Sequence, residues 1–230
     1  MWLRRTCHEL RLHVAAIRST LKVALGGFAG EVSGELRQIL ERGAARTGEL
    51  LELIDDLLIL SWSREDKING QEEIVVMGDV LEKVVARNQA EATEKKMTIE
   101  MQVPPNFPVL HVNEKCMEHL FGNLVANAIK YSPQGTRVLV EAQKKIDGIC
   151  VKISDQGIGI PPADINRIFD EFFRAKNARE FAREGTGLGL SIVRSIVAGC
   201  KGTIRVESEV GKGTTFQVTI PAPQPTKKTS

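Results

Sequence analysis

Gly185-Thr186-Gly187-Leu188-Gly189-Leu190-Ser191 stands directly before an apolar helical stretch in the last quarter of this 230-residue chain. The glycines let the backbone pass close to phosphate oxygens, and a helix beginning near Leu188 adds its N-terminal dipole. The stretch is not a Walker motif, because no Gly-Lys-Ser/Thr follows. It is not the dinucleotide fingerprint either, because Leu190 occupies the place of the third glycine. Alone, it is equally typical of a tight turn and of a phosphate-binding loop.

A second segment, Asn123-Leu124-Val125-Ala126-Asn127-Ala128-Ile129-Lys130, places polar groups on one face of a helix. Asn123 and Asn127 are about one helical turn apart, and Lys130 follows near the same face. Amide oxygens together with a lysine suit Mg²⁺ and phosphates. In isolation, such asparagines are more often helix caps or solvated side chains.

Two further segments complete the pattern. Asp155-Gln156-Gly157-Ile158-Gly159 follows an apolar strand, and Gly211-Lys212-Gly213-Thr214 precedes the last strand. A carboxylate at a strand end can accept a hydrogen bond from the adenine amino group, and Gly157 and Gly159 let the backbone fold back under a ligand. The competing interpretation of this segment is an ordinary Asp-Gly turn. The four segments in this order predict a nucleotide site.

The composition narrows the class of protein. Hydrophobic residues make up 42% of the chain, and the net charge of +2 argues against nonspecific attraction to nucleic acid. The four cysteines lie far apart without a CxxC pair, which predicts reduced, buried thiols rather than a zinc site or disulfides. No apolar run approaches the ~20 residues of a membrane span, so we expect no membrane segment in this chain. The expected location is cytoplasmic, either as a soluble chain or as the cytoplasmic part of a larger, membrane-tethered protein.

Residues 1–66 are predicted to form two antiparallel helices around the glycine-rich break at 26–30. Each helix carries apolar residues at spacings of three and four, which places them on one face. In the first helix these residues are Leu10, Val14, Ile17 and Leu21; in the second they are Leu36, Ile39, Leu40, Leu50, Leu51, Ile54, Leu57 and Leu58. A two-helix hairpin cannot bury both stripes alone, so we expect a homodimer through residues 1–66 that forms a four-helix bundle.

Residues 67–72 are predicted to be a polar linker, residues 73–221 a mixed α and β domain, and residues 222–230 a disordered tail. The predicted strands are 74–77, 97–103, 109–112, 137–145, 149–154, 203–208 and 214–220, with a hairpin turn around Asp147-Gly148. The predicted helices are 79–95, 114–131, 162–169 and 188–198. The polar residues 175–184 predict a mobile loop.

With Phe169-Asp170-Glu171-Phe172-Phe173-Arg174 between them, these segments resemble the N box, F box and glycine boxes of sensor histidine kinases. That family shares the Bergerat-type ATP-binding fold with gyrase, Hsp90 and MutL. The resemblance covers about residues 5–220. It implies an α+β chain in which an N-terminal antiparallel helical hairpin, forming a dimeric four-helix bundle, precedes an α/β-sandwich ATP-binding domain of Bergerat type.

The resemblance also implies a set of site residues. It makes Asn127 the Mg²⁺ ligand, with Asn123 beside it, and Arg174 a phosphate contact. Residues 175–184 become the ATP lid. The other expected nucleotide contacts are Lys130, Tyr131, Asp155 (to adenine), Gly157, Gly159, Gly185, Thr186, Gly187, Leu188, Gly189, Leu190 and Thr214. From their spacing alone, Phe169 and Phe172 are expected in the core.

His8-Glu9-Leu10-Arg11 resembles the H box of the same family. At about 100° per residue, His8 lies about 200° from Leu10 and therefore points away from the predicted bundle core. His13 lies only about 40° from Ile17 and therefore faces the core or its edge, so a packed or capped histidine is expected there. The resemblance implies that a neutral nitrogen of His8 attacks the γ-phosphorus of ATP, while Glu9 orients the other ring proton. It further implies transfer to an aspartate of a separate response-regulator receiver domain.

The sequence departs from the family pattern after Arg11, where Leu12 replaces the usual Thr or Asn and His13 the usual Pro. Leucine cannot hydrogen-bond the water that attacks a phospho-aspartate, so weak phosphatase activity is expected. Loss of the proline predicts a straighter helix. Three alternatives remain: an ATP-binding pseudokinase or dimeric scaffold, a serine kinase of the anti-sigma type, and a gyrase- or MutL-like ATPase. The last is disfavoured because no transducer or DNA-binding region follows.

Overall fold

The computed structural model describes residues 2–28, 30, 32–64, 73–182 and 185–222. The chain divides into two compact units, Met1–Trp62 and Ser63–Ser230. The predicted linker 67–72 and residues 223–230 of the predicted tail lie outside the described residues. Each unit is described by itself below.

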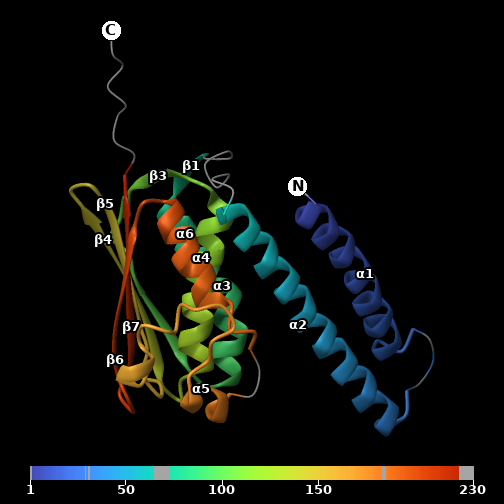
Figure 1. Ribbon diagram of the computed structural model, residues 1–230. Coiled ribbons are helices and arrows are strands. Elements are labelled where there is room, and N and C mark those ends of the chain that lie inside the picture. The colour runs from blue at the N-terminus through green and yellow to red at the C-terminus, as the bar shows by residue number, and fades with distance from the viewer. Residues whose placement is uncertain (1, 29, 31, 65–72, 183–184, 223–230) are drawn as a thin grey trace. The chain divides into compact units, whose positions relative to one another are not determined.

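The first unit is an antiparallel helical hairpin of α1 (Trp2–Leu25) and α2 (Gly34–Arg64), shown in blue to cyan in Figure 1. Cys7 and Val14 of α1 are buried with Ile54 and Leu58 of α2, and partly buried leucines of α2 pack against this cluster. An ion pair between Arg11 Nε and Asp55 Oδ1, 3.3 Å apart, joins the two helices at their polar edge. The two helices thus bury only a narrow apolar seam between them.

The predicted single apolar stripe on α1 is split in two. Val14 is buried against α2, whereas Leu10 and Ile17 are 49% and 53% exposed in the single chain. His13 is exposed as well, so it is not packed within the chain as expected. The reason is that periodicity places residues on a face but does not say which part of that face the neighbouring helix covers. Among the α2 side chains that the structure describes, the large apolar ones that are exposed are Leu36, Ile39 and Leu50.

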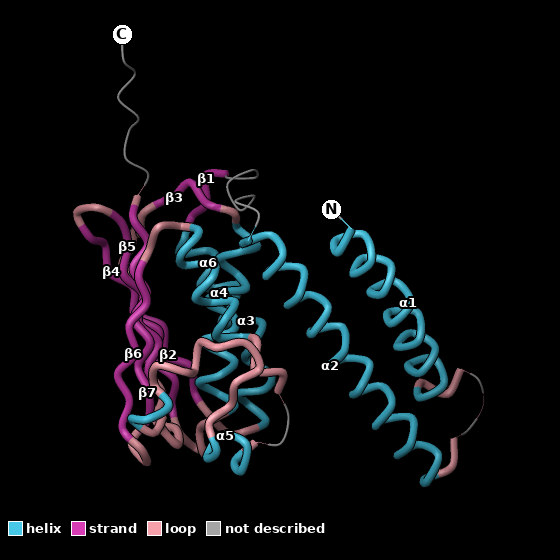
Figure 2. Tube along the Cα trace, in the orientation of Figure 1, coloured by secondary structure: helices cyan, strands magenta, loops and turns pink. Residues whose placement is uncertain are grey.

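The second unit is a two-layer α/β sandwich (Figure 2). Its five-stranded sheet has the order β2-β4-β5-β7-β6; β2 is parallel to β4, and the other neighbours are antiparallel. Helices α3, α4 and α6 lie on one face of this sheet, and β1 and β3 form a separate antiparallel pair (Figure 1). The strands are β1 (Glu73–Val76), β2 (Thr98–Gln102), β3 (Val109–Val112), β4 (Arg137–Lys145), β5 (Gly148–Ser154), β6 (Thr203–Glu209) and β7 (Gly213–Pro221). The helices are α3 (Met77–Glu94), α4 (Glu114–Lys130), the 3₁₀ turn η2 (Pro162–Asp164), α5 (Lys176–Phe181) and α6 (Gly189–Gly199).

Alternation along the strands explains why the sheet is covered on one face only. In β4, Val138, Val140 and Ala142 are buried, while the residues between them are partly or fully open to solvent. The open face carries polar side chains, for example Glu141 opposite Lys152 on the neighbouring strand β5. This period of two is typical of a sheet with one buried face. Helix α4 supplies the opposing apolar layer, in which Phe121, Leu120 and Leu124 are fully buried.

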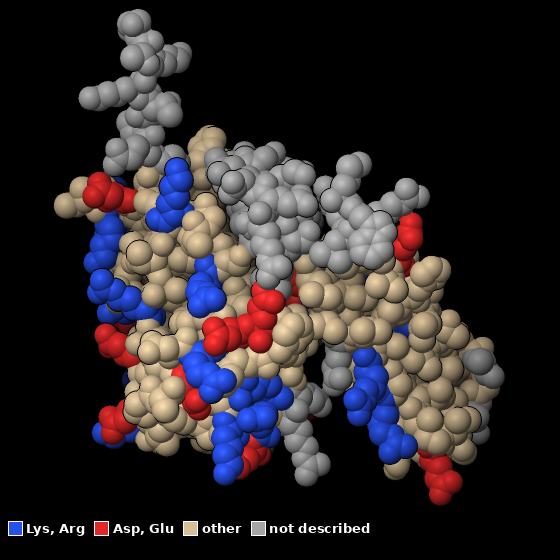
Figure 3. Space-filling view, in the orientation of Figure 1, with Lys and Arg blue, Asp and Glu red and all other residues tan. Residues whose placement is uncertain are grey.

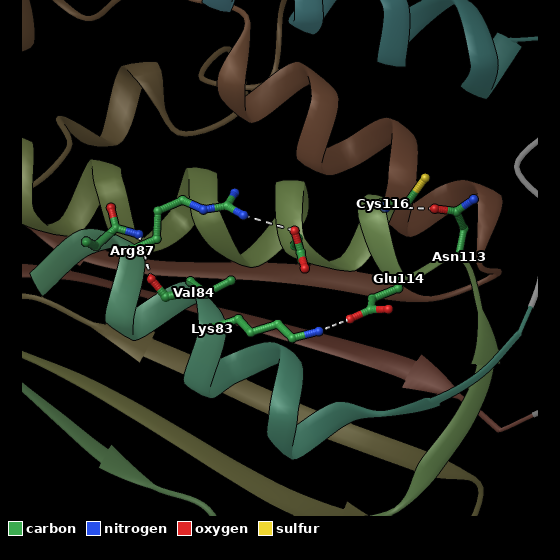
Figure 4. Close-up of polar contacts among 8 residues, drawn as sticks. Lys83, Val84, Arg87, Asn113, Glu114 and Cys116 are labelled. Atoms are coloured by element: carbon green, nitrogen blue, oxygen red, sulfur yellow. Dashed lines mark hydrogen bonds and ion pairs between the residues drawn. The ribbon is translucent and has the colours of Figure 1, made fainter.

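Helices α3 and α4 are joined side by side by surface ion pairs (Figure 4). Lys83 and Arg87 of α3 reach Glu114 and Glu118 of α4, the second pair with an N–O distance of 3.1 Å. Exposed pairs of this kind add little stability, about 0–1 kcal/mol each. The N-cap of α4 contributes more to the stability of this end of the helix. The side chain of Asn113 accepts a hydrogen bond from the backbone N–H of Cys116 at 3.1 Å.

Three local predictions need correction. The predicted helix 162–169 is only a 3₁₀ turn, η2, followed by irregular turns. The predicted mobile loop 175–184 contains the short helix α5. The hairpin turn between β4 and β5 lies one residue earlier than predicted, since Lys145 pairs with Gly148. Gly148 belongs to strand β5. A Cβ there would stand 2.1 Å from the carbonyl oxygen of Ile220, so glycine is required for the close approach of the neighbouring strand β7.

Candidate nucleotide site

Asp155, which directly follows β5, is held by two backbone donors. Its Oδ1 accepts hydrogen bonds from the N–H of Gly157 at 2.8 Å and of Thr214 at 3.0 Å. Burial raises the pKa of the Asp155 carboxyl from 3.8 to about 6, although both N–H donors act in the opposite direction. Both of these hydrogen bonds use Oδ1, which leaves Oδ2 to accept a hydrogen bond from a ligand.

The glycines around Asp155 are required by protein packing. A Cβ on Gly157 would lie 2.5 Å from the carbonyl oxygen of Tyr131, and one on Gly213 would lie 2.0 Å from that of Asp155. At Gly159, φ is +66° and a Cβ would lie 2.1 Å from the carbonyl oxygen of Glu209. Such distances exclude any side chain. Close backbone approach at Gly157 and Gly159 is consistent with the expectation that these glycines let the chain fold back here, and their expected contact with a ligand stays a prediction.

Ser208 on β6 connects this loop to the glycine segment 211–214, and no motif in the sequence pointed to this residue. Its hydroxyl accepts from the N–H of Ile160 at 2.8 Å and donates to the carbonyl of Gly213 at 3.0 Å. The hydroxyl of Thr214, 7% exposed, lies 2.9 Å from it. Thr214 thus contributes its backbone N–H to Asp155 and its hydroxyl to the loop.

The polar face of α4 meets the start of α6. Asn123 Nδ2 donates to the carbonyl of His119 at 3.0 Å, and a Cβ on Gly189 would lie 2.6 Å from Asn123 Oδ1. Asn127 lies one turn further along α4 and is half-buried. At the end of α4, Lys130 Nζ lies 3.0 Å from where a Cβ of Gly185 would stand. The structure therefore brings the asparagine segment and the glycine loop together, as the sequence predicts.

The glycine loop is shaped by the segment before it. The carbonyl of Gly187 accepts from the N–H of Phe172 at 3.0 Å, and a Cβ at Gly187 would lie 2.7 Å from the carbonyl carbon of Phe172. Thr186 Oγ1 accepts from the N–H of Leu188 at 3.2 Å. The side chain of Leu188 is fully buried, so this residue can offer a nucleotide only its backbone, while Leu190 is half-buried.

Phe172 is not a core residue, contrary to the expectation from its spacing. It is 64% exposed and has φ of +63°, an uncommon conformation for an aromatic residue. Periodicity suggested burial because it presumes a continuous helix, and the chain is irregular here. The left-handed turn at Phe172 is what brings its N–H to Gly187.

Arg174 anchors the segment expected to be the ATP lid. Its guanidinium donates to the carbonyls of Gly185 and Ala178, both at 3.4 Å, and to that of Ala182. Asn177 Nδ2 donates to the carbonyl of Gly159 at 2.9 Å, which ties α5 to the loop after Asp155. Arg174 thus holds lid backbone in this structure, and its expected contact with a phosphate stays a prediction.

Basic side chains gather at the α5 end of this unit (Figure 3). Lys176 and Arg179 of α5 are both exposed. Their positive charge favours the approach of a polyanion such as a triphosphate. Among the described residues, no group of three or more His, Cys, Asp and Glu side chains is arranged to hold a metal ion.

His8 and Glu9 lie in α1 of the other unit, and the side chain of His8 is outside the described residues. Glu9 is exposed, and Leu12, one turn after His8, is 59% exposed. No helix in the described part of the chain is long and apolar enough to cross a membrane.

The sandwich and its site define an ATPase unit of the Bergerat class, and comparison with known proteins gives the family. Residues 112–224 match the family "Histidine kinase-, DNA gyrase B-, and HSP90-like ATPase". The chain is 35% identical over 219 residues to the sensor-like histidine kinase SenX3 of Mycolicibacterium smegmatis, covering 93% of this chain and 55% of that protein. The chain belongs to the sensor histidine kinases, and it spans about half the length of the curated relatives it matches.

Solved structures share the fold. The histidine kinase AdeS of Acinetobacter baumannii superposes with a TM-score of 0.65 at 24% identity, covering 94% of this chain and 98% of that one. Full-length ShkA, solved in complex with AMPPNP, gives a TM-score of 0.75 at 23% identity and covers 97% of this chain and 46% of that one. Both similarities extend over the helical hairpin and the α/β sandwich together.

Proposed function

We propose that this chain is the ATP-dependent kinase core of a two-component sensor, which phosphorylates its own His8 and passes the phosphoryl group to an aspartate of a response regulator. The observation that carries the proposal is the approach of Gly189 to Asn123, because it places the N-terminus of α6 beside the polar face of α4. A helix N-terminus of this kind favours phosphate. Asp155, at the end of the neighbouring strand β5, supplies an acceptor for a base.

In this proposal, Asp155 Oδ2 accepts from the adenine amino group, and Lys130, Tyr131 and the amides at residues 185–190 contact the rest of the nucleotide. Asn127 holds Mg²⁺ through its amide oxygen, with Asn123 beside it. When bound, the cation offsets negative charge on the phosphates. Support comes from the acceptor geometry of Asp155 and from the polar face that Asn123 and Asn127 share.

The proposed transfer forms a bond between a neutral nitrogen of His8 and the γ-phosphorus and breaks the bond from that phosphorus to the bridging oxygen of ADP. The proton on the other ring nitrogen stays on the imidazole, oriented by Glu9, so that the attacking nitrogen keeps its lone pair. Backbone amides and the ammonium of Lys130 stabilise charge on the transferred group.

A second copy of the chain is proposed to cover the exposed apolar residues of the hairpin. Leu10 and Ile17 are about half-exposed, as are Leu36, Ile39 and Leu50 on α2. Pairing two hairpins through these residues gives a four-helix bundle and removes the apolar stripe from water.

The first test is incubation with Mg²⁺ and γ-labelled ATP beside a His8→Gln variant. We expect wild-type protein to acquire label that is lost in acid and survives base, because a phosphoramidate is acid-labile, and the variant to acquire none. The measurement is the label retained on the protein after each treatment. Absence of label despite ATP binding favours a scaffold, and acid-stable label that persists in the variant favours a serine kinase; either outcome refutes phosphorylation of His8.

A second expectation concerns Leu12. Because a leucine one turn after His8 cannot hydrogen-bond a water, wild-type protein should dephosphorylate its regulator slowly, and Leu12→Thr should raise that rate at least about tenfold. The measurement is the decay of regulator phospho-aspartate with added kinase, and Leu12→Ala is the control that removes leucine without adding a hydroxyl. Brisk dephosphorylation by the wild-type protein contradicts this expectation.

A further inference from the structure

A lysine outside all of the nucleotide motifs caps the end of α4. Lys95, which follows α3, donates from Nζ to the carbonyls of Ile129 at 2.9 Å and of Lys130 at 3.0 Å. The last carbonyls of a helix have no partner within that helix, and a cation placed there also interacts favourably with its dipole. Lys95 therefore supplies a donor to the carbonyl of Lys130 and a second, shorter hydrogen bond to that of Ile129, which also accepts from the N–H of Ser132 at 3.4 Å.

The backbone of Lys95 is fixed on both sides. Its N–H donates to the carbonyl of Glu91 at 3.1 Å, and its carbonyl accepts from the N–H of Gly135 at 3.2 Å. Lys96 turns the chain with φ of +53°, after which the side chain of Met97 is 3% exposed. The ammonium thus projects from a half-buried residue whose backbone is held by hydrogen bonds. It can therefore restrain the end of α4 instead of moving with it.

The capped end of α4 is joined to two loops of the proposed nucleotide site. Tyr131 lies directly after α4, and its carbonyl accepts from the N–H of Ile158 at 3.0 Å, between Gly157 and Gly159. Lys130 Nζ lies beside Gly185 of the glycine loop. The turn at Lys130 and Tyr131 is therefore held from one side by Lys95 and from the other by the loop after Asp155.

We propose that Lys95 is a positioning residue for nucleotide binding, which sets the place of Lys130 and Tyr131 without touching the nucleotide. This inference rests on the proposed function, because it presumes that ATP binds between α4 and the loops at 155–159 and 185–190. Without the ammonium, the last turn of α4 frays, Lys130 leaves the glycine loop, and the contact of Tyr131 with Ile158 loosens. Affinity for ATP falls, while the chemistry at saturating ATP is little changed.

The test compares Lys95→Met, which keeps the apolar stem, with Lys95→Arg, which keeps the donors. Loss of hydrogen bonds from a charged group should weaken binding of trinitrophenyl-ATP about tenfold in Lys95→Met, and Lys95→Arg should restore it to within about threefold. The KM for ATP in autophosphorylation should rise by a similar factor, with kcat within about twofold. Lys144→Met is the matched control, because it makes the same change at an exposed position on β4.

Hydrogen exchange separates positioning from general loss of stability. In Lys95→Met, the amides of Tyr131 and Ile158 should exchange faster, whereas that of Phe216 in the interior strand β7 should not change. Faster exchange at all three sites, or unchanged affinity in folded Lys95→Met, overturns the proposal. If Lys95→Met does not fold, Lys95→Gln replaces it, and full affinity in that variant overturns the proposal equally. Failure of the wild-type protein to bind trinitrophenyl-ATP refutes the proposed function instead.

Discussion

Asp155→Asn is expected to abolish tight ATP binding and, at the same time, to stabilise the nucleotide-free protein. In the asparagine variant, Oδ1 can still accept hydrogen bonds from the N–H groups of Gly157 and Thr214. However, an NH₂ group replaces Oδ2 and faces the adenine amino group, so two donors meet and no hydrogen bond forms. A site built to hydrogen-bond one group rejects the mismatched group strongly, so we expect affinity to fall at least about a hundredfold. Titration with trinitrophenyl-ATP measures this loss.

The stabilisation follows from the raised pKa. Burial holds the pKa of the folded Asp155 carboxyl at about 6, against 3.8 for an ordinary aspartate. The folded carboxyl therefore keeps its proton up to about pH 6, whereas the unfolded one loses it near pH 4, and wild-type stability falls as the pH rises between these values. Above pH 6 the buried charge destabilises the fold, and its removal should add about 1 to 2 kcal/mol to the free energy of unfolding.

Two pH series provide the control. Wild-type affinity for ATP should fall as the pH drops through about 6, because protonated Asp155 can no longer present a carboxylate oxygen to the adenine amino group. The free energy of unfolding of Asp155→Asn should lose the dependence between about pH 4 and pH 6 that the wild-type protein shows. Tight ATP binding by the variant at neutral pH refutes the assignment of Asp155 to adenine.

Apart from η2 and α5, the sequence predicted the element order, and it predicted the polar face of α4, because both depend on local pattern. The spacing of Asn123 and Asn127 fixes one face of a helix in any surroundings. The position of Asp155 could be predicted equally well, since the apolar strand β5 ends one residue before it. These features can be predicted without knowing which residues pack against them.

Features that depend on contacts between residues far apart in the sequence could not be predicted in the same way. Gly157 must be glycine because the carbonyl of Tyr131 lies beside it. The residues around Gly157 in the sequence do not predict this contact. Helix α5 contains no apolar stripe that would predict it; it is held by hydrogen bonds from Arg174 and Asn177. The exposed, left-handed Phe172 depends likewise on its contact with Gly187.

Gly213→Ala is expected to produce the largest loss of stability of any single methyl addition near the site. Gly213 begins β7 with φ of +127°, and a Cβ there would lie 2.0 Å from the carbonyl oxygen of Asp155 and 3.0 Å from Cα of Gln156. Both obstacles are backbone, which cannot move aside as a flexible side chain would. We expect the free energy of unfolding to fall by about 3 kcal/mol or more, as measured by urea denaturation.

Gly211→Ala in the same hairpin is the matched control for this prediction. Gly211 also has a positive φ, +79°, but a Cβ there meets nothing within 4 Å. Only the left-handed backbone is then unfavourable to alanine, at about 1–2 kcal/mol. The difference between the two losses reports the contact of Gly213 with the backbone of Asp155 together with the greater strain of alanine at φ of +127° than at +79°, and equal losses would contradict the prediction. Because Thr214 donates its N–H to Asp155 from the next position, Gly213→Ala should also weaken ATP binding in whatever protein remains folded, whereas Gly211→Ala should leave affinity unchanged.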